Sequence, residues 1–147
     1  MMNGNVIGLM GFDTSSSPAR PAFDKKYKAN YRRPTTWEVS SNYDSMTYLA
    51  KAIQAANTVD DVYAIRAAFP KAFPILADKY CNESHGISPN GRVHLMVGVQ
   101  EIRSGKFAKS ELYVWWAKTQ ADFDKIQKAS KFQGQLKWFK SKMGTLE

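Results

Sequence analysis

Apolar residues recur with distinct periods along this chain, and each period predicts an element of secondary structure. Residues 5–12, NVIGLMGF, are a short apolar run that ends in DTSSSP, the pattern of a buried strand followed by a loop. Ser17 before Pro18 predicts a helix cap with proline in the first turn. In the helix that follows, apolar residues recur every fourth position: Ala19, Phe23, Tyr27 and Tyr31.

The clearest helical pattern covers residues 39–56. Its apolar positions fall on one stripe, which we expect to face the core: Tyr43, Met46, Leu49, Ala50, Ile53 and Ala56. Thr58, with Asp61 three residues later, predicts a capping box before a third helix, which Pro70 ends. Residues 71–84, KAFPILADKYCNES, show no clean period, so we expect them to be irregular.

Residues 84–107, SHGISPNGRVHLMVGVQEIRSGKF, contain both histidines of the chain and two turn signals. Asn90 and Gly91 tolerate the left-handed backbone that tight turns require. Beyond them, apolar residues alternate over 93–99 as in a strand, RSGK predicts a second turn, and residues 111–116 predict a short strand. We interpret His85 as a loop residue and His94 as facing away from the valines, so the segment is architecture rather than a catalytic or metal-binding loop.

A last helix begins at Thr119, with Asp122 completing a second capping box. Its apolar positions keep a helical spacing toward the C-terminus, although Gly134 weakens the middle: Phe123, Ile126, Ala129, Phe132, Leu136, Phe139 and Met143. The order of strands and helices predicts a mixed α/β fold. We divide the chain into residues 1–117, an α/β lobe fragment, and residues 118–147, a basic amphipathic helix packed on it.

The 147 residues are enough for one domain, and the net charge of +8 favours acidic partners without naming one. Half of that excess lies from Lys118 onward, and a solvated lysine face is the expected explanation. Cys81 is the only cysteine, so no disulfide within the chain is expected, and no metal-binding spacing is present. We expect neither an export signal nor a membrane span in this sequence.

Motifs that would carry catalysis are absent. The sequence contains no GxSxG, HExxH, GxGxxG or phosphate-loop pattern, and Asp60-Asp61 sits at a helix start, where negative charge favours the helix dipole. No nucleophile is paired with an evident base. We therefore expect no enzymatic activity, no cofactor and no metal.

The order of these elements resembles the C-terminal part of a type I periplasmic substrate-binding protein of ABC transporters, of the branched-chain amino acid and amide group. VIGLMGFDTSSSPARPAFDKKYKANY is similar to the strand, loop and KY-type helix of that family. The long helix carries a YDA-type motif as Tyr43-Asp44-Ser45, and GISPNGRVHLMVGVQEIRSGKF resembles the closing strand with its flanking turns. The resemblance covers residues 6–107 and implies a partial lobe, with a Rossmann-like sheet and flanking helices, plus the C-terminal helix.

In that family the ligand lies between two lobes, against loops at the carboxyl ends of strands. By resemblance, ligand contacts would come from Phe12 and Asp13 after the first strand, from Trp37 and Glu38 entering the long helix, and from Tyr43. An aromatic ring covers an apolar ligand body, and a carboxylate binds an ammonium or amide donor. The alternative is that Phe12 and Trp37 are core residues and that Glu38 is an acid at a helix N-terminus.

The resemblance implies a solute-binding component, or a truncated homologue, of an importer for amino acids or related small amides and carboxylates. It implies lobe closure on the ligand, an ABC permease as partner, and a periplasmic or extracellular location. Because a part of a lobe leaves sheet edges uncovered, we also expect a homo-oligomer. We expect no nucleic-acid partner. The competing hypothesis is a basic nucleic-acid-binding module that uses the C-terminal lysines with Trp115, Trp116 and Trp138.

Overall fold

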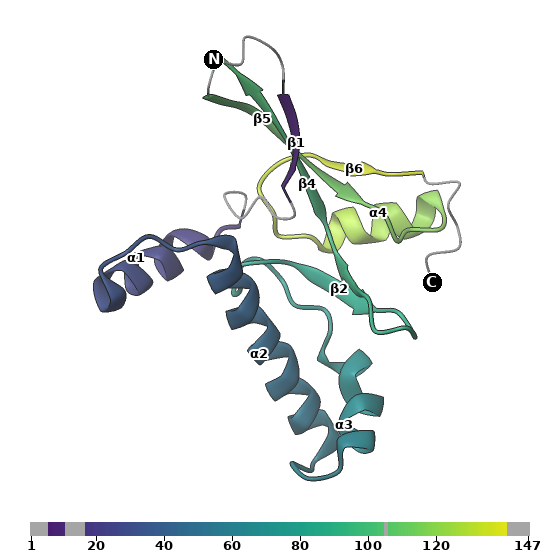
Figure 1. The fold of residues 1–147 in the computed structure, drawn as a ribbon. Helices are drawn as coiled ribbons and strands as arrows, with labels where there is room; N and C mark the ends of the chain where they lie inside the picture. Colours follow the sequence, from purple (N-terminus) through teal and green to yellow (C-terminus); the bar gives the residue numbers. More distant parts are fainter. Residues whose placement is uncertain (1–5, 11–16, 105, 141–147) are drawn as a thin grey trace.

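The computed structural model describes residues 6–10, 17–104 and 106–140. The chain contains both strands and helices, which confirms the predicted mixed α/β fold (Figure 1). In order, the elements are β1 (Val6–Met10), α1 (Arg20–Tyr31), α2 (Trp37–Ala56), α3 (Val62–Ala68), the 3-10 helix η2 (Phe69–Ala72), β2 (Ser84–Ile87), β3 (Val93–Leu95), β4 (Val97–Arg103), β5 (Lys106–Val114), α4 (Gln120–Ala129) and β6 (Leu136–Trp138).

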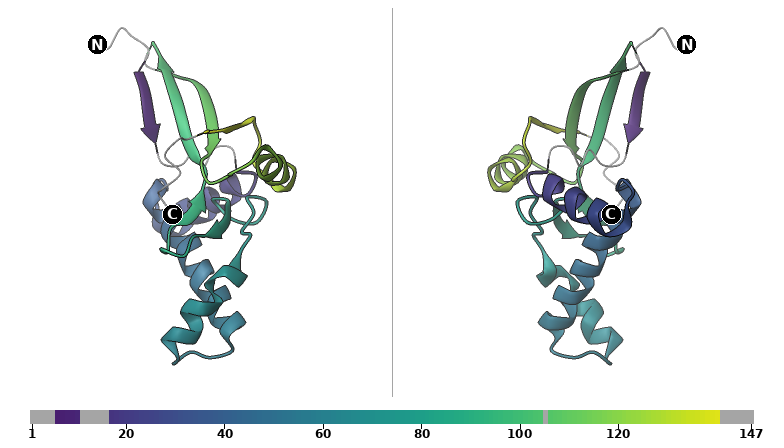
Figure 2. Two further views of the ribbon diagram at one scale, coloured as in Figure 1. Left: turned by 90° about the vertical axis from the view of Figure 1, so that its right-hand side faces the viewer. Right: turned by 90° about the vertical axis from the view of Figure 1, so that its left-hand side faces the viewer.

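The larger sheet has the strand order β1-β4-β5-β6. β1 pairs antiparallel with β4, β4 pairs antiparallel with β5, and β6 runs parallel to β5. A Rossmann-like sheet is built from parallel strands, whereas two of the three strand pairs in this sheet are antiparallel. The strand directions therefore differ from that expectation. β2 and β3 form a separate antiparallel pair. Figures 1 and 2 show α2 and α3 at one end of the molecule and the β1, β4 and β5 strands at the other.

The N-cap of helix α1 lies two residues later than predicted. Its N-cap is Ala19, and the Ser17 hydroxyl instead donates to the carbonyls of Ala77 and Tyr80, at 3.0 and 2.9 Å. Ser17 is therefore a buried tie between distant segments rather than a helix cap. The C-cap of this helix is Arg32, which takes the left-handed conformation at φ 54°.

Helix α2 forms where the periodicity predicts it, but it buries a different face. Tyr43 and Met46 from the predicted stripe are 50% and 65% exposed. The buried side chains instead follow a four-residue repeat that shares no residue with the predicted stripe: Ser40, Asp44, Tyr48 and Ala52. The prediction was wrong because two of these residues are polar, and they are buried only because partners elsewhere in the chain satisfy their hydrogen bonds.

Helix α3 begins near its predicted start with a different cap. The Asp61 carboxylate accepts from the amides of Tyr63 and Ala64, while the Thr58 hydroxyl accepts from the two residues before the helix. η2 then leads into residues 73–83, which run without strand or helix, as expected. This segment is nevertheless part of the core, because Ile75, Ala77 and Cys81 are buried within it.

Two hairpins follow at the predicted turns. Gly91 has a φ of +85° and its amide donates to the Ser88 carbonyl at 2.9 Å, so the β2–β3 turn needs the conformational freedom of glycine. Ser104, at φ 50°, lies in the turn between β4 and β5. The predicted single strand over 93–99 is interrupted at Met96, which is 2% exposed and belongs to the core.

The last helix is shorter than predicted. The Thr119–Asp122 capping box is present, but α4 ends at Ala129. Residues 136–138 form β6 beside β5 instead of continuing the helix, and Gly134 lies between them at a φ of +133°. Apolar residues of this tail complete a core between α4 and the sheet. The buried members of that core are Met96, Leu112, Val114, Ala117, Phe123 and Leu136. The division of the chain at residue 117 stays a prediction.

Among the described residues, no helix is both long and apolar enough to cross a membrane.

Candidate ligand-binding site

Three of the five predicted ligand contacts can be placed, and all three lie on α2. Trp37 is its first residue and is 51% exposed, so this indole is not part of the core. Glu38 is exposed in the first turn, and Tyr43 is 50% exposed. Phe12 and Asp13 lie outside the described residues. The start of α2 therefore presents an aromatic ring and a carboxylate to the surface.

These three side chains do not converge on one point. Successive residues of a helix are separated by about 100° around its axis, so Tyr43 projects from a different side of α2 than Trp37 and Glu38. The Tyr43 ring lies 5.0 Å from that of Phe23 on α1. Tyr43 thus holds the two helices together, while Trp37 and Glu38 remain neighbours at the open end of α2.

Glu38 is held in its charged form. The hydroxyl of Thr36 hydrogen-bonds to its carboxylate and lowers the pKa of Glu38 below its usual range, with a smaller contribution from its own backbone. A negative charge here also lies near the positive end of the helix dipole. The side chain is therefore available as an acceptor for a cationic or amide donor group.

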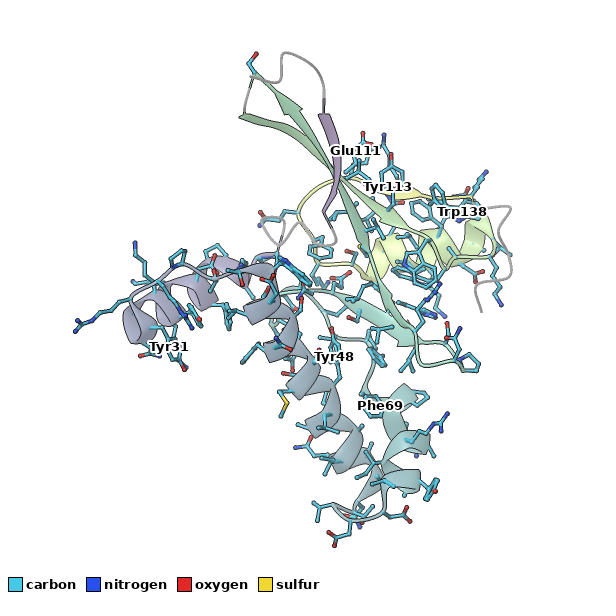
Figure 3. All side chains as sticks on the ribbon, viewed as in Figure 1. Tyr31, Tyr48, Phe69, Glu111, Tyr113 and Trp138 are labelled. Atoms are coloured by element: carbon cyan, nitrogen blue, oxygen red, sulfur yellow. The ribbon has the colours of Figure 1, made fainter. Side chains whose placement is uncertain are left out.

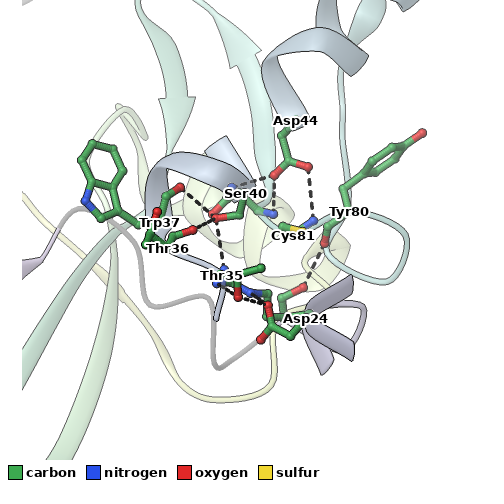
Figure 4. A network of polar contacts seen from close by, with 11 residues as sticks. Asp24, Thr35, Thr36, Trp37, Ser40, Asp44, Tyr80 and Cys81 are labelled. Carbon is green, nitrogen blue, oxygen red and sulfur yellow. Dashed lines mark hydrogen bonds and ion pairs between the residues drawn. The ribbon is translucent and has the colours of Figure 1, made fainter. Parts of the chain in front are cut away.

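A buried arginine on α1 fixes the start of α2 through hydrogen bonds. Arg20 on α1 is 8% exposed, and its guanidinium donates to Asp24 at 2.6 Å, to the Ser40 hydroxyl at 3.1 Å and to the Thr35 hydroxyl at 3.2 Å. Thr35 also bonds directly to Asp24. Figure 4 shows this network on one side of the helix start, with the indole of Trp37 pointing away from it. The Trp37 carbonyl accepts from the Ser40 hydroxyl, so the backbone of Trp37 is tied to this network.

The backbone of Trp37 joins the same network. The Ser40 hydroxyl donates to the Trp37 carbonyl at 2.9 Å, while its oxygen accepts from Arg20. One turn further along, the buried carboxylate of Asp44 accepts from both amide groups of Asn82 and from the amide of Cys81. These bonds tie α2 to α1 and to Cys81 and Asn82, so hydrogen bonds to two other segments hold the start of α2 in place.

A second polar centre joins the helical part of the molecule to the sheet. The Glu83 carboxylate lies 2.7 Å from His85 Nε2 and accepts from the amides of Ala77 and Lys131 at 3.2 and 2.8 Å. Burial raises the pKa of Glu83, but these bonds, with one from Ser130, outweigh it and keep the pKa below its usual range. The carboxylate is a structural tie between segments 48 residues apart.

Both histidines stack on one tryptophan. The rings of His85 and His94 lie 5.8 and 5.4 Å from that of Trp116, and His94 Nε2 lies 2.8 Å from the Ser88 hydroxyl. Within the part of the chain that the structure describes, no group of three or more possible metal ligands is present. His85 lies in β2 rather than in the predicted loop, and both histidine rings pack on Trp116.

The structure also contains a groove that the sequence did not indicate. It has a volume of about 560 Å³ and runs between α2, the α3–η2 corner and the β2–β3 hairpin. Its lining includes Tyr48, Arg66, Phe69, Ile87, Ser88 and Val93, and it includes none of the predicted ligand contacts that can be placed. The sequence signals in this region were Pro70, which predicts the end of a helix, and the Asn90-Gly91 turn, and neither predicts a groove.

Comparison with known proteins gives one structural likeness. No family model matches the sequence, and no curated protein matches it. Among solved structures, a leucine-binding protein from Thermotoga maritima matches with a TM-score of 0.56 and 19% sequence identity over 74% of this chain. The chain spans 31% of the length of that protein. At this identity the likeness shows the fold alone, a mixed α/β arrangement that this chain shares with part of that protein.

Proposed function

We propose that this chain is part of a solute-binding component of an ABC importer for amino acids or related small amides and carboxylates. The observation that carries the proposal is the TM-score of 0.56 to a protein described as leucine-binding, over 74% of this chain. Binding would need no covalent step, because closure of two lobes around the solute is sufficient. The remainder of the receptor, a permease partner and a periplasmic or extracellular location belong to the same proposal.

Trp37 and Glu38 are the contacts on which this proposal relies among the described residues. The exposed indole provides an apolar surface, and the charged carboxylate beside it provides an acceptor for an ammonium group. Phe12 and Asp13 would complete the site after β1. Tyr43 would act at its margin, since its ring already packs on Phe23.

The test is a thermal-shift and calorimetric screen of the purified 147-residue chain. The panel contains aliphatic and aromatic amino acids, aromatic carboxylates, urea and short amides, with a DNA oligomer at low and at high salt. A solute that binds the native state raises Tm, and the stabilisation grows with the logarithm of one plus its concentration divided by Kd. We expect a selective rise of a few degrees with one class of amino acid at millimolar concentration.

Variants separate this site from nonspecific binding. Trp37→Ala and Glu38→Gln should each weaken the amino acid response at least about tenfold, since each removes one contact of the order of 1.4 kcal/mol. Tyr63→Ala is the matched control, because Tyr63 is an 81% exposed aromatic on α3. A salt-sensitive response to DNA alone, or no response to any small solute, would contradict the proposal.

A further inference from the structure

We propose that the groove between α2, the α3–η2 corner and the β2–β3 hairpin is a binding site for a small carboxylate with an apolar body. Its volume of about 560 Å³ lies within the range of about 300–1,000 Å³ that is typical of small-molecule sites. The site is separate from the start of α2. Tyr48 follows Trp37 by eleven residues, which is about 16 Å along a helix.

The walls of the groove are apolar. Phe69 begins η2 on one side, and Ile87 and Val93 come from the two strands of the hairpin on the other. Tyr48 forms part of the lining from α2 and is only 6% exposed. Figure 3 labels Tyr48 and Phe69 on the two helical elements that border the groove. These side chains would surround a phenyl ring or a branched aliphatic chain, whose transfer from water drives binding.

The Tyr48 hydroxyl is not available to a ligand. It lies 2.6 Å from the hydroxyl of buried Ser84, and its ring packs against Phe73 with centroids 5.4 Å apart. Burial raises the pKa of Tyr48 to about 12, with a smaller contribution from the charge of Asp44. Tyr48 therefore stays a neutral, fixed part of the lining, and the charge that selects a ligand has to come from elsewhere.

That charge is supplied by Arg66 in the last turn of α3. It is exposed and lines the groove, and within the described part of the chain its guanidinium makes no hydrogen bond or ion pair. Guanidinium groups bind carboxylates through two parallel hydrogen bonds. No aspartate or glutamate is among the described residues that line the groove. An anionic head group is therefore favoured, and an ammonium group has no counter-charge there.

The hairpin contributes a fixed rim. Ser88 lines the groove and is 5% exposed, and its hydroxyl is held 2.8 Å from His94 Nε2, so its position is set before a ligand arrives. Pro70 and Pro89 lie on opposite rims and restrict the backbone on both sides. A groove that keeps its shape loses less entropy on binding than a flexible one.

The test uses 3-phenylpropionate as the probe, with 3-phenylpropanamide and 2-phenylethylamine as neutral and cationic analogues, in titrations followed by calorimetry and by protein NMR. We expect 3-phenylpropionate to bind with a Kd on the order of a millimolar, as its size allows. The amide and the amine should bind at least about tenfold more weakly. Chemical-shift changes should centre on Ile87, Ser88 and Val93.

Three variants locate the interaction. Arg66→Gln should weaken 3-phenylpropionate binding at least about tenfold, whereas Arg66→Lys should retain part of the affinity. Trp37→Ala should leave it unchanged, which distinguishes this groove from the amino acid site proposed at the start of α2. Equal binding of the carboxylate and the amide, an unaffected Arg66→Gln variant, or no binding at 10 times the expected Kd would each overturn the proposal. Because Arg66 is exposed, unchanged Tm values serve to show that the variants fold.

Discussion

Asp44 and Asn82 are joined by two short hydrogen bonds across 38 residues of sequence. The backbone and side-chain amides of Asn82 donate to Asp44 Oδ2 at 2.7 and 2.6 Å, and the amide of Cys81 donates to Oδ1 at 3.3 Å. Burial raises the pKa of Asp44, and these hydrogen bonds oppose that rise. The carboxylate thus holds the segment after η2 against the middle of α2.

Replacing Asp44 by alanine should strongly destabilise the fold. The change would leave three amide donors without acceptors in the protein interior, and each unsatisfied buried group costs about 1–3 kcal/mol. We expect a loss of about 2–4 kcal/mol in the free energy of unfolding, measured by urea titration. Asp78→Ala, at an exposed position of the same segment, should change it by less than about 0.5 kcal/mol. Equal effects of the two variants would show that the Asp44 network contributes little.

Glu83 should make the free energy of unfolding depend on pH. Its pKa in the folded chain is lowered from an ordinary value of 4.5, so folding favours the ionised form. The resulting stabilisation is fully present above about pH 4.5 and is lost as the pH falls through the lower, folded pKa. Urea titrations between pH 3 and pH 7 should show this decline. In Glu83→Gln, the free energy of unfolding should depend less on pH in the acid range, and it should be lower than that of the wild type at neutral pH. Asp78→Asn should keep the wild-type profile.

Cys81 should be unreactive while the chain is folded. The thiol is 1% exposed, and burial together with the negative charge of Asp44 raises its pKa to about 12. The reactive thiolate is therefore scarce at pH 8. A disulfide reagent should modify the wild-type chain only as fast as it unfolds, and completely in urea. In an Ala121→Cys variant, the added thiol at an exposed position should react at once. Rapid native-state labelling of Cys81 would contradict the burial described here.

Local signals were sufficient to predict most elements of this fold. The Thr119–Asp122 box, the Asn90-Gly91 turn and the period of α2 each depend on residues close together in the sequence. The face that α2 buries could not be predicted in this way. Ser40 and Asp44 are polar, and their burial is stable only because Arg20 and Asn82, from distant parts of the chain, bond to them.

The structure of the C-terminal segment also could not be predicted from its local pattern. The spacing of Phe132, Leu136 and Phe139 fits a helix, but Leu136 instead pairs with Leu112 of β5. Gly134 was the one local sign that the helix would not continue. The groove has a similar origin, because Arg66 and Ser88 are brought together by the packing of α3 and a hairpin. The hydrophobic periodicity of one segment does not predict which distant segment will pack beside it. Trp37, by contrast, was predicted as a ligand contact from the family resemblance, as a residue of the segment that enters the long helix.

The two threonine N-caps allow the value of capping to be measured within one chain. Thr119 accepts a hydrogen bond from the Asp122 amide at 3.1 Å, and the Asp122 carboxylate accepts from the Thr119 amide at 3.0 Å. Thr36 occupies the same position before α2 but makes no cap hydrogen bond through its side chain. Thr119→Ala should therefore lower the free energy of unfolding by about 1 kcal/mol, and Thr36→Ala by clearly less. Since α4 packs Phe123 into the core beside β6, the loss should appear in the global urea transition rather than as local fraying. A Thr36→Ala variant as unstable as Thr119→Ala would refute this account of the two caps.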